Sequence, residues 1–298
     1  MAATERELTS PQIAFAGNKY KWIDAYIETL DPETQYNEIV RTVTLFRATE
    51  LLTNIDYVTN SILVIQEPKG GEAMFCTGKT TTHKQKRFVD TMAMFRMWFL
   101  NGTGSEKLNE SVGRLNNLHM SIAKNVPGNF DGDDDFIIAT CRMGISNHLF
   151  QKRLGFPGFD DQMKTAWYNF CAGVIRMVEK ESGPVKGFPT SFNGMVEFND
   201  NFNNQNWTPS MHSQHVAHML VEQFVERWSP IHATDFIFRQ IILTFLPESI
   251  IKLHKLGQRR PWLEMFIVFY FQVKLLMIFL LPDPREPTFA ARWPNRGK

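Results

Sequence analysis

The sequence has few cysteines, and its positive and negative charges are nearly balanced. Each of these two features excludes some classes of protein. Three cysteines, Cys76, Cys141 and Cys171, occur among 298 residues. Their odd number and wide spacing give neither a disulfide framework nor a zinc-binding pattern, and they favour a reducing compartment. Lysine and arginine total 32 against 31 aspartates and glutamates, so nothing indicates a nucleic acid as partner.

The N-terminus lacks the apolar segment that a signal peptide or an N-terminal membrane anchor requires. Residues 1–7 read Met-Ala-Ala-Thr-Glu-Arg-Glu, which is polar and carries acids. We therefore expect an intracellular protein without a signal peptide, either cytoplasmic or associated with a membrane.

Apolar residues recur mostly at helical spacing, and few stretches alternate as strands do. We predict an all-α fold built as one large helical bundle, since 43% hydrophobic residues suffice for a sizeable core. Irregular structure is expected over 66–83 and 183–209, where proline, glycine or asparagine are frequent. The predicted helices cover residues 19–30, 34–55, 84–101, 106–124, 135–153, 160–180, 210–227, 232–245, 248–256 and 262–281.

One predicted helix carries a histidine on its apolar side. Leu108, Val112, Leu115 and Ile122 form the apolar stripe, and His119 fills the gap between the last two. A buried imidazole needs a partner. Two interpretations stay open: a core histidine bonded to a backbone carbonyl, or a metal ligand.

The preceding helix places a cation and a hydroxyl together. Arg87 and Thr91 are four residues apart, so they lie on neighbouring turns of one helix face. If that face is exposed, the arginine is solvated and the threonine bonds to its own helix. If it is buried, the two residues and His119 border one polar cavity.

Two segments of these helices resemble the core signature of the rubber-oxygenase and mycophenolic-acid-oxygenase family. They read Arg87-Phe88-Val89-Asp90-Thr91 and Arg114-Leu115-Asn116-Asn117-Leu118-His119. The family consists of all-helical proteins once known only as a domain of unknown function. The similarity extends over roughly residues 75–250, and only these first motifs are specific.

The resemblance implies a haem-dependent oxygenase with an internal cavity for haem and substrate. His119 would bind the iron of haem b as its proximal ligand, and Arg114 would help to bind the cofactor. Arg87, Asp90 and Thr91 would form the catalytic side, where dioxygen meets an apolar substrate of isoprenoid type. Residues 66–256 would be the catalytic core, with an N-terminal helical segment over 1–65 and a hydrophobic helix and tail over 257–298.

One position departs from the latex-clearing members, which have a lysine where this chain has Asp90. An acid responds to bound oxygen differently from an ammonium, so Asp90 argues against rubber as substrate more than against oxygenase chemistry. Two alternatives therefore stay open. One is a non-catalytic helical protein that binds haem or a hydrophobic ligand. The other is a cofactor-free isomerase or cyclase that uses Asp90 as acid or base.

The most hydrophobic stretch runs from Trp262 to Leu281. Its twenty residues are long enough to span a bilayer. Glu264, Gln272 and Lys274 fall inside it, and charges in mid-membrane are costly. We expect a helix that closes the cavity or lies on a membrane surface, rather than one that spans a bilayer.

Overall fold

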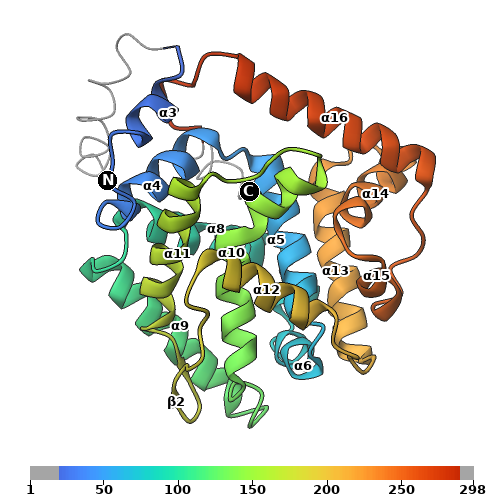
Figure 1. Cartoon of the computed structure of the whole chain (residues 1–298). Coiled ribbons are helices and arrows are strands. Elements are labelled where there is room, and N and C mark those ends of the chain that lie inside the picture. The colour runs from blue at the N-terminus through green and yellow to red at the C-terminus, as the bar shows by residue number, and fades with distance from the viewer. Residues whose placement is uncertain (1–19, 289–298) are drawn as a thin grey trace.

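The computed structural model describes residues 20–288, which are almost entirely helical (Figure 1). The all-α prediction is confirmed, and the described strands are a single antiparallel pair, β1 (Glu179–Lys180) and β2 (Gly183–Pro184). The polar segment 1–7 and the end of the tail, 289–298, lie outside the described residues. The α-helices are α3 (Trp22–Ile27), α4 (Tyr36–Arg47), α5 (Glu50–Val64), α6 (Pro68–Cys76), α7 (Lys79–Thr82), α8 (Lys84–Asn101), α9 (Glu106–Ala123), α10 (Asp133–Arg153), α11 (Asp161–Ile175), α12 (Phe192–Asn203), α13 (Met211–Trp228), α14 (Asp235–Phe245), α15 (Glu248–Leu253) and α16 (Pro261–Leu280).

Both segments predicted to be irregular contain helices, so this prediction is wrong. In the first, Pro68 occupies the start of α6, where its fixed φ suits a helix, and the Glu67 side chain accepts a hydrogen bond from the Gly70 amide. In the second, the Ser191 hydroxyl accepts a bond from the Gly194 amide and caps α12. These local caps start helices in stretches whose composition is typical of loops.

The three segments expected from the sequence share one hydrophobic core. Ile55 of α5, Phe88 of α8 and Phe271 of α16 belong to the same cluster of buried residues. A second cluster joins Trp98 of α8 to Phe170 of α11. The N-terminal segment and the C-terminal helix are therefore parts of the bundle, and not units that fold beside it.

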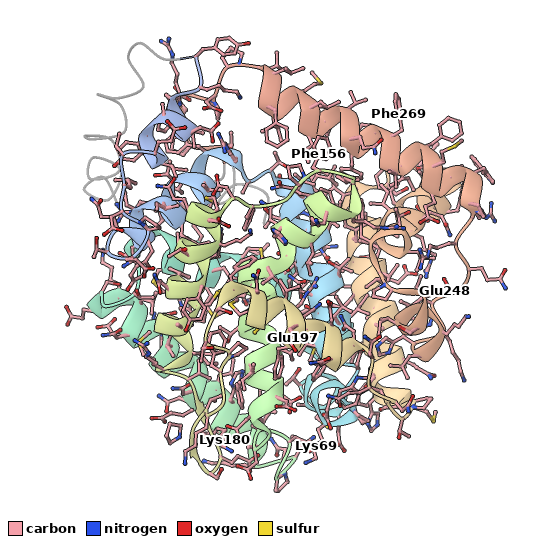
Figure 2. The ribbon with its side chains drawn as sticks, viewed as in Figure 1. Lys69, Phe156, Lys180, Glu197, Glu248 and Phe269 are labelled. Carbon is pink, nitrogen blue, oxygen red and sulfur yellow. The ribbon has the colours of Figure 1, made fainter. Side chains whose placement is uncertain are left out.

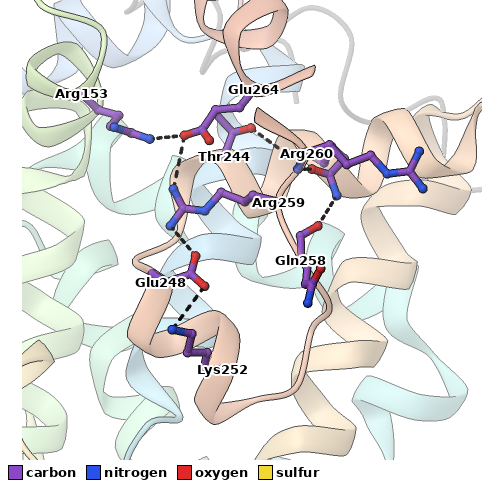
Figure 3. Close-up of polar contacts among 9 residues, drawn as sticks. Arg153, Thr244, Glu248, Lys252, Gln258, Arg259, Arg260 and Glu264 are labelled. Atoms are coloured by element: carbon purple, nitrogen blue, oxygen red, sulfur yellow. Dashed lines mark hydrogen bonds and ion pairs between the residues drawn. The ribbon is translucent and has the colours of Figure 1, made fainter. Parts of the chain in front are cut away.

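The C-terminal helix α16 lies across one end of the bundle and is anchored at its start by ion pairs (Figures 1 and 3). Glu264 pairs with Arg153 at the end of α10 and, at 3.3 Å, with Arg259. Arg259 also pairs with Glu248 of α15 at 3.2 Å. Glu264 therefore links α16 to α10 directly and to α15 through Arg259.

The other end of α16 is held by the first described residues. Tyr20 donates its hydroxyl hydrogen to the Leu280 carbonyl at 2.6 Å, and Trp22 donates its indole N–H to Pro284 at 3.0 Å. Lys21 pairs with Asp283 at 3.2 Å. Helix α16 is thus attached to the rest of the bundle at both of its ends.

Between these ends, one side of α16 faces the core and the other faces outward. Leu263, Ile267, Phe271 and Leu275 are buried, one per turn. The opposite side is exposed and apolar, and Figure 2 shows Phe269 on it, pointing away from the bundle. Of the helices described, α16 alone is long and apolar enough to cross a membrane.

Candidate functional site

A cavity of about 1740 Å³ runs between the central helices. Ligand pockets usually measure about 300–1,000 Å³, so this one can hold a large cofactor, a long substrate or both. Each bordering helix contributes a stripe of side chains at helical spacing. Members of these stripes are Asp56 and Asn60 from α5, Arg87 and Thr91 from α8, Leu115 and His119 from α9, and Ala139 and Arg142 from α10.

The cavity extends to the underside of α16. Leu275, Ile278 and Phe279 border it there, and Phe156, in the loop after α10, packs its ring 5.7 Å from that of Phe279 (Figure 2). Helix α16 therefore borders one end of the cavity, and its closing of the cavity stays a prediction.

His119 is the most distinctive group on the cavity wall. Its imidazole stacks on Phe130, with ring centroids 4.8 Å apart, and lies 5.6 Å from the ring of Phe136. Burial lowers the pKa of His119 to about 4, so the ring is neutral near pH 7. Within the described part of the chain, its buried Nδ1 has no hydrogen-bond partner. A neutral imidazole with an unpartnered nitrogen is what a metal ion or a ligand donor would complete.

Arg87 and Thr91 border the same cavity as His119, as the sequence analysis expected if these helix faces were buried. Arg87 donates to the Tyr57 hydroxyl of α5, and its second terminal nitrogen lies 3.4 Å from the Met74 sulfur of α6. The Thr91 hydroxyl donates to the Arg87 carbonyl at 2.8 Å. Toward a ligand, Thr91 can therefore act only as an acceptor.

The other two residues taken from the resemblance lie toward solvent. Asp90 touches the rim of the cavity, but its carboxylate pairs with Lys86 at 2.6 Å, and both side chains are more than half exposed, at 60% and 71%. Arg114 is also exposed and pairs with Glu110 on the outer side of α9 at 3.6 Å. It precedes His119 by five residues, which is about 140° around the helix, so it points away from the cavity.

Asp56, Asp135 and Arg142 are among the charged cavity groups that the sequence analysis missed. Asp56 borders the cavity and has an exposed side chain, although protein atoms surround it closely enough to desolvate its carboxylate. Burial raises the pKa of Asp56 to about 6, against the opposing effects of Arg142, Ser146 and Asn60. Burial also raises the pKa of Asp135 to about 7, and the nearby acids Glu67 and Asp134 add to the shift.

A sequence signal for these residues exists, although it is weak. Asp56 and Asn60 stand at i,i+4 within the largely apolar α5, and Arg142 and Ser146 repeat the spacing in α10. The two pairs meet, because Arg142 donates to Asn60 Oδ1 through two nitrogens at 2.8 and 2.6 Å. Polar pairs at this spacing within the buried stretches of two helices are the pattern that would have indicated a buried polar cluster.

The residues present fit a haem in one respect, since a haem needs a single axial ligand from the protein and His119 is a neutral imidazole whose buried Nδ1 has no partner among the described residues. Within residues 20–288, no group of three or more histidines, cysteines or acids is arranged to hold a bare metal ion. No protein-family model matches this chain, and no curated protein matches it significantly.

Proposed function

We propose that this protein is a haem b-dependent oxygenase that oxidises an apolar substrate inside its central cavity. The observation that carries the proposal is His119, a neutral imidazole with an unpartnered Nδ1 on the wall of a cavity that Arg87 and Thr91 also border. The isoprenoid type of substrate rests on the resemblance of the Arg87–Thr91 and Arg114–His119 segments alone.

Different residues of this chain would hold the haem, orient the reacting groups and exclude water. His119 would hold the iron, and its ring is kept in place by stacking on Phe130 and by contact with the tilted ring of Phe136. Arg87 supplies a cation that Tyr57 keeps in place. When bound, haem b would supply the reaction with dioxygen, while the apolar walls would bind the substrate and exclude water from it.

Haem reconstitution tests the proposal. The purified protein should take up haemin and show a Soret band, and His119→Ala should lose it while keeping its helical circular dichroism. His254→Gln is the matched control, because burial lowers the pKa of His254 to about 4 as well, yet His254 does not border the cavity. A wild-type protein that binds no haemin, or a His119→Ala variant that binds it equally well, would overturn the proposal.

The substrate's route follows from the outer side of α16, for which we propose contact with a membrane surface. Contiguous exposed apolar patches of this kind commonly mark interaction sites. Leu275, Ile278 and Phe279 of the same helix border the cavity, so a molecule dissolved in lipid would meet the cavity directly under the helix. The exposed apolar stripe of α16 consists of Trp262, Met265, Phe266, Phe269, Val273, Leu276, Met277 and Leu280.

A second candidate function is acid–base catalysis without haem, as in an isomerase or cyclase. The observation in its favour is the carboxyl of Asp135, which borders the cavity and whose pKa is raised to about 7 by burial. A group that titrates near neutral pH can both accept and donate a proton. Asp90, expected in this role from the sequence, is instead paired with Lys86 toward solvent. Retained turnover in a haem-free preparation, lost in Asp135→Asn, would favour this candidate.

A further inference from the structure

A cluster of polar side chains interrupts the apolar wall of the cavity, and we call it the polar pole. It consists of Asp56 and Asn60 from α5, Arg142 from α10, and Asn199 and Asp200 from α12, all of which border the cavity. The geometry points to the polar pole as the binding site for a hydroxyl or ammonium group on a ligand whose apolar chain fills the rest of the cavity.

The guanidinium of the polar pole is already occupied by the protein. Arg142 donates from Nε and Nη2 to Asn60 Oδ1, at 2.8 and 2.6 Å, and from Nη1 to Asn199 Oδ1 at 3.2 Å. Burial lowers the pKa of Arg142 to about 10, while the charges of Asp56 and Asp200 oppose that shift. Because three of its five N–H groups already serve neutral amides, Arg142 has only two left to donate to an acidic ligand.

The two carboxylates keep acceptor capacity for a ligand, although Asp56 already accepts side-chain hydrogen bonds from Ser146 and Asn60. Asp56 and Asp200 both have exposed surface and both border the cavity. Asp200 accepts one bond from Asn199 Nδ2 at 3.0 Å, which leaves acceptor capacity on its carboxylate. With both acids ionised, the cluster carries two negative charges and one positive charge. Its net charge favours a hydrogen-bond donor or a cation, and it repels a carboxylate.

The position of the polar pole along the cavity sets the shape of the ligand. Positions along helix α10 give the distances between parts of the cavity. Phe136 contacts His119, and Arg142 follows six residues later. Phe150 follows eight residues after Arg142 and contacts Phe271 of α16. At 1.5 Å per residue these steps are about 9 Å and about 12 Å along the axis. The polar pole therefore lies between the His119 end and the α16 end of the cavity, so the chain of the ligand can extend toward either end.

Ligand binding by the haem-free protein tests this assignment. A bound molecule is a substrate only if the proposed function is correct, so the titration leaves haem out. Dodecylamine, dodecanol and dodecanoate share one chain and differ in their end group. We expect calorimetric titration at about pH 8, where Asp56 is ionised, to give about tenfold or tighter binding of the amine and the alcohol over the acid.

Variants test whether the polar pole, and not the rest of the cavity, determines the preference for the amine. Asp56→Asn and Asp200→Asn keep the side-chain shape, and together they should remove most of the preference for the amine. His119→Ala should keep that preference even if it abolishes haem binding, so failure of one proposal is distinguishable from failure of the other. Dodecanoate binding as tightly as the amine, no binding of any of the three, or a preference that survives both asparagine substitutions would each overturn the assignment.

Discussion

Arg87 joins two helices at the same time as it borders the cavity, so its removal should affect stability. Arg87→Ala deprives the buried Tyr57 hydroxyl of its donor. We expect the free energy of unfolding to fall by about 1–3 kcal/mol. Arg114→Ala is the control: that side chain is exposed and pairs only with Glu110, so the change should stay below about 0.5 kcal/mol in urea titrations. Equal losses in the two variants would contradict the placement of Arg87.

The neutral state of His119 predicts a pH effect on stability. Its pKa falls from 6.5 to about 4 on folding, because burial penalises the charged ring. Between these values the unfolded chain binds a proton that the folded protein does not, so acid destabilises the fold across this interval. The free energy of unfolding should fall more steeply from pH 6.5 to about 4 in the wild type than in His119→Gln. Asp56 acts in the opposite direction but is common to both proteins, so parallel curves would contradict the burial of a neutral His119.

At the residue scale, periodicity located the side chains that continue an apolar stripe. His119 was found because its neighbours at helical spacing are apolar, and Arg87 with Thr91 because they share a face. Arg114 and Asp90 came from the resemblance alone, and their angular positions turn them toward solvent. Asp56 escaped notice because one acid in an apolar helix has the same sequence pattern whether it faces water or a cavity.

At the element scale, close helix packing depends on glycine at one crossing. A Cβ on Gly71 of α6 would lie 2.0 Å from the Ser213 hydroxyl and 2.8 Å from the Ser213 Cα of α13. Gly71→Ala should therefore destabilise by about 1–3 kcal/mol, despite the better helix propensity of alanine. Gly113→Ala in α9 is the control, since no described atom lies within 4 Å of the added carbon, and it should stabilise by about 0.5–1 kcal/mol. The thermal midpoints should move in opposite directions, and a shift of the same sign in both would contradict the close approach of α6 and α13.

Strongly periodic helices were predicted within a few residues of their observed ends, as α8 and α9 illustrate. The predicted helix over 34–55 is divided instead, because Thr49 caps a new helix with its hydroxyl and α5 continues to Val64. Helices α6 and α12 were missed because proline, glycine and asparagine dominate their surroundings. Composition over a long window conceals a cap that depends on one or two residues.

At the scale of the whole molecule, the outer side of α16 predicts membrane binding without insertion. The protein should sediment with phosphatidylcholine vesicles and be released by alkaline carbonate. Phe266→Glu and Phe269→Glu on the exposed stripe should each weaken sedimentation about tenfold or more, since a buried phenylalanine contributes about 1.5–3 kcal/mol. Met211→Glu is the control, because Met211 is 86% exposed but lies at the start of α13. Unchanged sedimentation of the two α16 variants, or resistance to carbonate, would contradict a surface contact.

The arrangement of the bundle around one cavity was only partly predictable. The sequence indicated an all-helical core and placed the His119, Arg87 and Thr91 faces inward. It did not indicate that α5 supplies a cavity wall, since its acid and amide meet Arg142 only through the packing of α5 against α10. It also offered both a membrane surface and cavity closure for α16, and only the folded structure shows that Leu275, Ile278 and Phe279 of this helix border the cavity.

Chemical rescue tests most directly whether His119 provides the ligand for a haem in this cavity. His119→Gly removes the imidazole and leaves a space beside Phe130 and Phe136 that free imidazole can occupy. We expect His119→Gly to lose the Soret band of the reconstituted wild type and added imidazole to restore it. A His119→Gly variant whose spectrum matches the wild type without imidazole would contradict haem binding through His119.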